Sequence, residues 1–126
     1  MIITLCGSTR FKDEFLKIQR DLTLQGHIVL SVGLFAHADN EELTPEDKIR
    51  LDNLHKEKIN MSDAIFVINK DGYIGESTYS EVDWANRMKK EVYFLEKPEG
   101  MEEEVPAEEQ EAQVVEEAPV VEEDQK

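Results

Sequence analysis

The chain has a single cysteine, Cys6, among its 126 residues, so it cannot form an internal disulfide. Disulfide-stabilised secreted domains are therefore excluded, and a reducing compartment fits the composition. A long apolar run is also missing. The N-terminal segment MIITLCGSTRF has only a few consecutive apolar residues, too few for a membrane span or for a secretory leader. We therefore expect a cytoplasmic protein that makes no membrane contact.

Positive charge is scarce, with 14 Lys and Arg against 29 Asp and Glu. The imbalance is uneven, because residues 97–126 hold 12 of the acids and 2 of the lysines, which is −10 of the total net charge of −15. Residues 1–96 are still net negative. Binding to nucleic-acid phosphates needs clustered Lys and Arg, so nucleic acid is excluded as a partner.

Residues 97–126 contain no aromatic residue, three of the four prolines and two copies of VVEE. Such a segment has too little apolar surface to offset the entropy of ordering it, so we predict a disordered acidic tail. A solubilising extension is preferred over docking of its valine pairs on a partner. Residues 1–96 then form one domain, whose small core oligomerisation would help.

Within residues 1–96, short apolar runs alternate with stretches of helical periodicity. The runs are nearly continuous in apolar character, as in strands buried on both faces, and cover residues 2–6, 27–32, 64–69 and 91–95. Helices are predicted from Phe11 to Gln25, from a cap at Thr44 to about Asn60, and from Ser77 or Thr78 onward. This order predicts an α/β fold, a flavodoxin-like, doubly wound parallel sheet of four to five strands in three layers. Ligands of such folds bind above the carboxyl ends of the strands.

Two loops are expected at that edge of the sheet. The first contains Gly7, Ser8, Thr9 and Arg10, and offers close backbone approach, free helix-start amides and a guanidinium group. An anion such as phosphate would fit there, although an ordinary strand-to-helix turn has the same composition. The loop matches neither a P-loop nor a dinucleotide-binding fingerprint.

The second loop begins the stretch GYIGESTYSEVDWA, residues 72–85, with two glycines, several hydroxyls and Glu81. Thr78 and Glu81 have the spacing of a capping box, in which the carboxylate only bonds to its own helix. A cap requires neither the glycines nor the dense hydroxyls, whereas a sugar-binding pocket uses both. Sequence spacing leaves capping and catalysis both open.

Three motifs together resemble the nucleoside 2-deoxyribosyltransferase superfamily, which includes the 2'-deoxynucleoside 5'-monophosphate N-hydrolases. They are CGSTR after the first strand, HKxKIxxSDA before the third and GYIGESTxSExxxA after it, and the likeness is greatest to a small bacterial and phage branch. The resemblance covers residues 1–96. It implies cleavage or transfer of an N-glycosidic bond by a retaining, two-step route in a cytoplasmic homo-oligomer.

The resemblance also implies roles for individual residues. Glu81 would be the nucleophile, kept ionised with help from the helix dipole and preceded by Gly75, Ser77 and Thr78 as substrate-binding residues. Ser8 and Arg10 would contact a 5'-phosphate, which favours nucleotides over free nucleosides. Glu76 and Asp83 are expected to be solvated acids near the helix start.

Relatives often carry an aspartate on the second helix that orients the sugar or protonates the leaving base. This chain has His55 at that place and Asp52 one turn earlier. His55 could act as a general acid, or it could be an ordinary surface or interface histidine. Asp63 is expected to end the helix rather than to touch substrate.

Two further features of the sequence concern metal binding and assembly. His37 and Asp39 lie in the long segment 33–43, which is expected to fold over the base, but no third and fourth ligand at workable spacing accompanies them, so no metal site is predicted. Trp84 is expected to be partly exposed in a monomer and so suggests a subunit interface.

The leading hypothesis is an enzyme that cleaves or transfers the N-glycosidic bond of a nucleoside or nucleoside monophosphate, with Glu81 as nucleophile and without metal or organic cofactor. The alternative is a non-catalytic nucleotide-binding sensor whose acidic tail recruits a partner. A third hypothesis, a hydrolase of a dinucleotide, is disfavoured because the Gly7–Arg10 loop is short.

Overall fold

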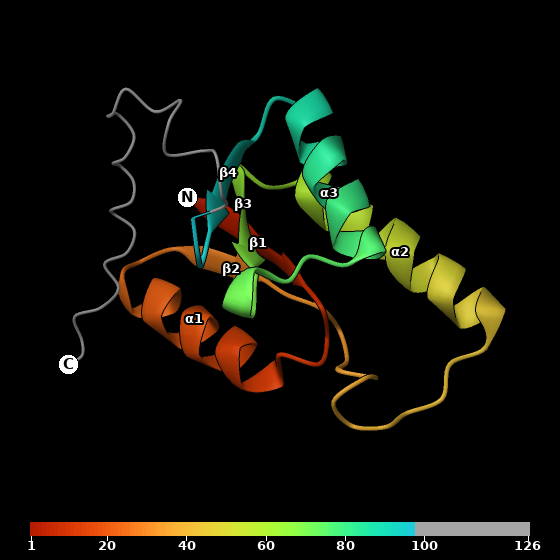
Figure 1. Ribbon diagram of the computed structural model, residues 1–126. Helices are drawn as coiled ribbons and strands as arrows, with labels where there is room; N and C mark the ends of the chain where they lie inside the picture. The colour runs from red at the N-terminus through yellow and green to blue at the C-terminus, as the bar shows by residue number, and fades with distance from the viewer. Residues whose placement is uncertain (98–126) are drawn as a thin grey trace.

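A computed structural model of the chain describes residues 1–97. Within them lie four strands and three α-helices, in the order β1 (Ile2–Gly7), α1 (Lys12–Leu24), β2 (Ile28–Leu30), α2 (Pro45–Asn60), β3 (Ala64–Ile68), α3 (Glu76–Arg87) and β4 (Glu91–Phe94), with a short 3-10 turn at Lys70–Gly72 (Figure 1). The predicted acidic tail lies, apart from Lys97, outside the described residues. No helix within residues 1–97 is long and apolar enough to cross a membrane.

The four strands form one parallel sheet in the order β2-β1-β3-β4. β3 is buried along its whole length, and Ile3 of β1 pairs with Ala64 of β3. The chain passes from β1 outward to β2 and then back across to β3, so the strand order reverses between β1 and β3. This is the flavodoxin-like arrangement predicted from the alternating pattern, and its ligand crevice lies at that reversal.

Alternate residues of β1 and β3 supply two apolar layers, one on each side of the sheet. Ile3, Leu5 and Phe66 pack against the Phe15, Ile18 and Leu22 side of α1. On the opposite side, Cys6, Ile65 and Val67 pack against Ile59 of α2 and Ala85 of α3. Consequently α1 covers one face, and α2 and α3 cover the other (Figure 1).

The helix ends follow local chemistry. Thr44 accepts a hydrogen bond from the Asp47 amide and the Asp47 side chain returns one, so the capping signal at the start of α2 is confirmed. α3 begins at Glu76 after the extended residue Gly75, one or two residues earlier than predicted. β2 is three residues long, shorter than the apolar run 27–32 predicts, because the chain leaves the sheet edge after Leu30.

Candidate active site

A cavity of about 670 Å³ opens at the carboxyl ends of β1 and β3. Its walls come from the loop after β1, the segment between β2 and α2, one side of α2 and the first turns of α3. This is the place where doubly wound sheets hold their ligands. Segments far apart in the sequence therefore meet around one space large enough for a nucleotide-sized molecule.

Gly7 brings the loop after β1 close to β3. A Cβ atom on Gly7 would lie 2.8 Å from the Ile68 carbonyl oxygen, and its φ of +154° is one that L side chains rarely adopt. Ser8 and Thr9 follow and line the cavity. Only glycine lets the two strand ends approach this closely and present the following hydroxyls to the cavity.

Arg10 is an exposed residue that does not line the cavity. Its Nε donates to Ser8 Oγ at 3.0 Å, and its guanidinium lies 4.5 Å from the centre of the Tyr73 ring. Ser8 and Tyr73 are themselves cavity-lining residues. Of the expected phosphate ligands, Ser8 therefore faces the cavity, and Arg10 is held at its rim by contacts with two residues that do.

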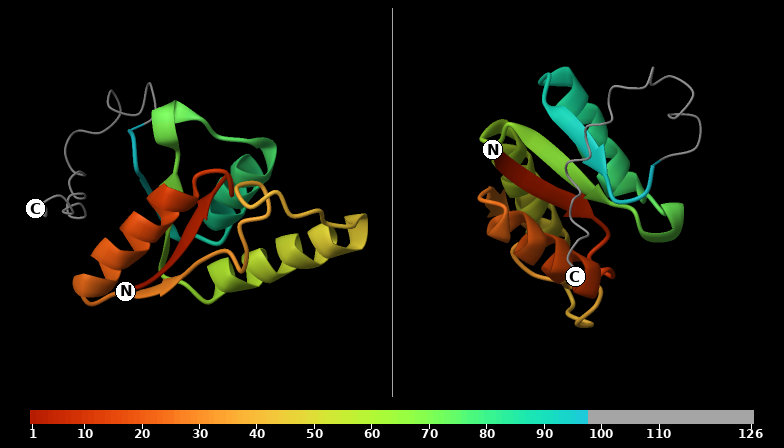
Figure 2. Two further views of the ribbon diagram at one scale, coloured as in Figure 1. Left: turned by 90° about the horizontal axis from the view of Figure 1, so that it is seen from below. Right: turned by 90° about the vertical axis from the view of Figure 1, so that its left-hand side faces the viewer.

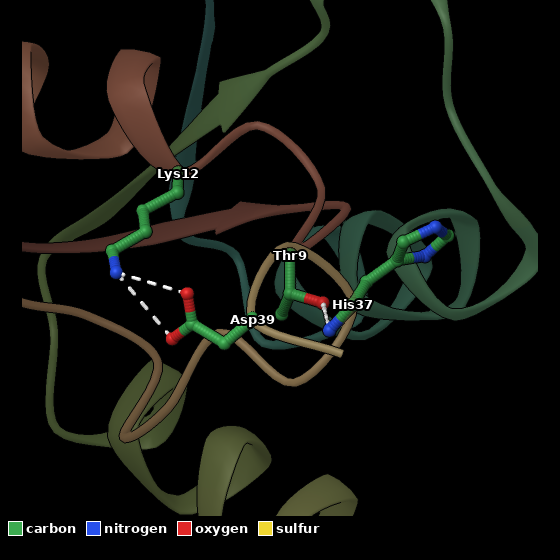
Figure 3. Close-up of polar contacts among 4 residues, drawn as sticks. All are labelled: Thr9, Lys12, His37 and Asp39. Atoms are coloured by element: carbon green, nitrogen blue, oxygen red, sulfur yellow. Dashed lines mark hydrogen bonds and ion pairs between the residues drawn. The ribbon is translucent and has the colours of Figure 1, made fainter. Parts of the chain in front are cut away.

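The segment between β2 and α2 curls beside the end of β1 (Figure 2, left). It contributes Leu34, His37 and Leu43 to the cavity wall. Two contacts tie it to the loop after β1 and the start of α1: the His37 amide donates to Thr9 Oγ1 at 3.2 Å, and Lys12 Nζ lies 3.0 Å from Asp39 Oδ1 (Figure 3). We call residues 33–43 the covering segment.

Replacing Asp39 with alanine should loosen the covering segment without unfolding the domain. Lys12 and Asp39 are both partly exposed, so their ion pair is worth about 0.2–1 kcal/mol. We expect amide hydrogen exchange across residues 33–43 to accelerate by up to about fivefold at low ionic strength. In 1 M salt the variant and the wild type should exchange at nearly the same rate, because the pair is screened. Equal exchange at low salt would show that the pair does not hold the segment.

Glu81 lies in the second turn of α3, because that helix starts at Glu76. The capping-box alternative for Thr78 and Glu81 is therefore wrong: Gly75 is the capping residue, and no side chain makes a capping hydrogen bond at this helix start. Glu81 instead lines the cavity with 14 % of its side chain exposed. Its carboxylate is not engaged by the amides of its own helix start.

Burial raises the pKa of Glu81 to about 7. A hydrogen bond with Cys6 opposes this rise, the negative charge of Asp52 adds to it, and Lys56 lowers the pKa again. The helix dipole is expected to help keep Glu81 ionised, yet loss of hydration is the largest influence on its pKa at this second-turn position. At neutral pH the carboxyl group exists as a mixture of its protonated and ionised forms.

His55 faces Glu81 from α2, with Nε2 at 3.9 Å from Glu81 Oε1. The pKa of His55 is lowered to about 4, mainly by burial and also by the charge of Lys58, while a hydrogen bond to the Leu5 backbone opposes both. The imidazole is therefore uncharged at neutral pH, and its contact with Glu81 is not an ion pair. His55 is a buried residue beside the cavity, rather than a surface histidine.

Most of the remaining predicted residues line the cavity. Asp52, Gly75, Ser77 and Thr78 all line it, Thr78 as a buried residue and Asp52 as an exposed one. Glu76 lines it as well, in the exposed first turn of α3.

Two other acids lie away from the cavity. Asp83 is exposed and pairs with Arg87 on its own helix. Asp63 accepts a hydrogen bond from the Ile2 amide at 2.8 Å, so its carboxylate ties the start of β1 to the chain before β3.

Trp84 has a structural role within the subunit. Its Nε1 donates to Asn60 Oδ1 at 2.9 Å, Lys56 Nζ lies 5.6 Å from the centre of its ring, and the side chain packs against the core on the α2–α3 side. Its partial burial is thus explained by contacts between α3 and α2. A subunit interface remains a prediction and gains no support from Trp84.

Sequence reasoning did not identify Cys6 as part of the site. Its thiol is fully buried beneath the cavity, and burial together with the charge and hydrogen bond of Glu81 raises its pKa. The only signal in the sequence was the strand alternation, which places Cys6 and Leu5 on opposite faces. Which helix residues lie across from Cys6 is decided by the packing of α2 and α3.

Comparison with solved structures supports the fold. A CMP N-glycosidase from Clostridium botulinum, BcmB, matches with a TM-score of 0.52 and 17 % sequence identity over 75 % of this chain and 70 % of its own. No protein-family model matches the chain, and no curated protein matches it. At this identity the likeness establishes the flavodoxin-like fold.

Proposed function

We propose that the chain cleaves the N-glycosidic bond of a nucleoside 5'-monophosphate, with Glu81 as the nucleophile. The observation that carries the proposal is the position of this carboxyl group: it lines a cavity at the carboxyl ends of β1 and β3, and it takes no part in capping its helix. A side chain that served only the helix start would have no reason to face this space.

The reaction requires two displacements at the anomeric carbon. In the first, a Glu81 oxygen bonds to that carbon while the carbon–nitrogen bond breaks, and the base leaves with the bonding electrons and takes up a proton from water in the cavity. In the second, water adds to the same carbon and gives up a proton to solvent, the bond to Glu81 breaks and the carboxylate is regenerated. A second base in place of water would make the protein a transferase.

The surrounding residues support this sequence of steps. The raised pKa of Glu81 reflects a dry carboxylate, which is more reactive toward a carbocation-like sugar than a hydrated one. Because His55 is uncharged at neutral pH, we do not assign it the role of general acid. Its role is to position the Glu81 carboxyl group, which lies 3.9 Å from its Nε2 atom. Asp52, which lines the same cavity, is assigned to orient the sugar by accepting a hydrogen bond.

A phosphate-bearing substrate is favoured by the loop after β1. Ser8 lines the cavity, and Arg10 already contacts both Ser8 and Tyr73 at its rim. A guanidinium at this place can turn toward a phosphate while keeping the aromatic contact. The cytidine monophosphate acted on by the structurally similar glycosidase makes CMP and dCMP sensible first substrates.

The test is to incubate the full chain with a panel of nucleosides and their 5'-monophosphates, with and without a competing free base, and to separate the products by chromatography. Release of base from the monophosphates is expected, at rates well above those for the free nucleosides. Exchange of bases would assign a transferase. Saturable nucleotide binding without any base release would contradict the proposal and support a non-catalytic sensor.

A further inference from the structure

Three side chains with metal-binding atoms meet at the base of the cavity, each from a different element. Cys6 comes from β1, His55 from α2 and Glu81 from α3, and their sulfur, nitrogen and oxygen atoms all lie within 4.8 Å of one another. Cys6 and His55 are buried, while Glu81 is partly exposed to the cavity. The glycosidic reaction proposed above uses the carboxylate but gives the thiol no task.

His55 supplies an independent sign that a ligand belongs here. Its side chain is 7 % exposed, and its Nε2 atom is buried without a hydrogen-bond partner. Leaving a buried polar atom unsatisfied costs about 1–3 kcal/mol. The Leu5 backbone accepts the imidazole's other hydrogen bond, so Nδ1 carries the proton, and Nε2 keeps a free lone pair 3.9 Å from Glu81 Oε1. Metal-bound histidines are usually held in this way.

The ligand set selects the kind of cation. One sulfur, one imidazole nitrogen and one carboxylate oxygen suit zinc, whereas calcium and magnesium prefer oxygen ligands. Zinc with one thiolate and one carboxylate forms a neutral cluster, which avoids placing net charge in a buried site. Zinc bonds of about 2.0–2.3 Å hold ligand atoms roughly 3.5 Å apart. The three side chains would therefore need to approach one another by about 1.3 Å at most, which small rotamer changes allow.

We propose that Cys6, His55 and Glu81 bind Zn²⁺, and that the bound metal inhibits the glycosidic reaction by occupying the Glu81 carboxylate. The inhibitory part rests on the proposed function, whereas the binding part does not. On binding, zinc–sulfur, zinc–nitrogen and zinc–oxygen bonds form, and the thiol proton and any proton on Glu81 pass to solvent. Glu81 and His55 both line the cavity, so water can complete the coordination from that side.

Cobalt reports directly on the thiolate. The chelator-stripped full chain, kept reduced, is titrated with Co²⁺, and a near-ultraviolet sulfur-to-cobalt absorption band is expected at one cobalt per chain. Cys6 is the chain's only cysteine, so this band cannot arise from the acidic carboxylates elsewhere. Added Zn²⁺ should abolish the band by displacement, with a Kd for zinc of about 1 µM or below. Absence of the band at saturating Co²⁺ would overturn the proposal.

Two variants test the proposed ligands, and a third serves as their control. Cys6→Ser should lose the band, and His55→Gln, which keeps the thiol, should weaken zinc binding at least tenfold even if Cys6→Ser folds poorly. His27→Gln changes a histidine that contacts the N-terminal amine outside the cavity, and it should bind zinc as the wild type does. Zinc affinity within threefold of wild type in a folded His55→Gln variant would contradict the assignment.

The inhibitory part is tested with a nucleotide that the chain cleaves. Half-inhibition is expected at a free Zn²⁺ concentration near the measured Kd, with full recovery after chelation, and magnesium should not inhibit. Zinc that binds but leaves base release unchanged, or accelerates it, would refute inhibition while the proposed function stands. If the chain releases no base at all, the proposed function and the inhibition fail together, and the cobalt titration still decides the metal site.

Discussion

Replacing Glu81 with glutamine should lower the rate of base release from a nucleoside monophosphate by at least about 10³-fold, because removing a nucleophile abolishes the covalent route. Glutamine has nearly the same shape as the carboxylic acid, so substrate affinity should change little. The measurement is a single-turnover assay with a chelator present, together with the Kd for the same nucleotide. A loss confined to the rate, with binding kept, is the signature of a group that acts in the transition state.

Asp83→Asn is the matched control. Asp83 lies on the same helix two residues later, is exposed, and pairs with Arg87 outside the cavity. Its replacement removes the same charge from α3 without touching the site, so base release should stay within about twofold. Nearly equal rates for wild type and Glu81→Gln would show that Glu81 is not the nucleophile, whether or not the cavity binds the nucleotide.

Glu81→Gln should also stabilise the protein at pH 8. The pKa of Glu81 is about 7 in the folded chain against an ordinary 4.5, so the folded state holds a proton that the unfolded state releases. The stabilising contribution of this group is complete below about pH 4.5 and is lost as the pH rises through 7, a change of about 3 kcal/mol. Glutamine stays neutral, so Glu81→Gln should exceed the wild type by about 2–3 kcal/mol at pH 8 in urea unfolding.

The contribution of His55 to stability depends on pH in the opposite sense. Its pKa falls to about 4 from an ordinary 6.5, so its contribution is complete above about pH 6.5 and is lost as the pH falls through 4. Between pH 4.5 and 6.5 the two groups cancel in the wild type. In Glu81→Gln the His55 dependence stands alone, and stability should rise by about 1.4 kcal/mol per pH unit across that range relative to wild type.

The comparison is made by urea unfolding of both proteins from pH 4.5 to 8 in chelator-containing buffer, with Asp83→Asn as the reference for loss of an exposed charge. Taking differences between variant and wild type removes the contributions of all other carboxylates. A variant that is less stable at pH 8, or one whose stability runs parallel to the wild type throughout, would show that Glu81 titrates near its ordinary value.

The raised pKa of Glu81 has a general cause. Hydration favours the ionised carboxylate, and the packing of α2 and α3 over β1 removes much of that hydration from Glu81 while leaving one side open to the cavity. The same burial leaves His55 uncharged. Strain of this kind is retained at functional sites and offset by the rest of the core.

The sequence alone was sufficient for the architecture. Short Ile- and Val-rich runs with helical stretches between them require parallel strands with crossovers, and the Thr44 capping signal marked the start of α2 to the residue. These features depend on neighbours in the chain, on side-chain periodicity and on turn chemistry. They can be predicted without knowing which residues pack against one another across the core.

Tertiary structure decided the use of each side chain. Thr78 and Glu81 have capping-box spacing, yet the extended residue is Gly75 and the helix begins at Glu76. Glu81 therefore lies in the second turn, beyond the reach of the free amides at the helix start. Likewise, no spacing relates Cys6 to His55 and Glu81, because they come from three elements and meet only when α2 and α3 pack on β1. Backbone periodicity is local, whereas desolvation and side-chain contact depend on residues distant in the chain. That difference is why the fold could be predicted from the sequence and the protonation states at the site could not.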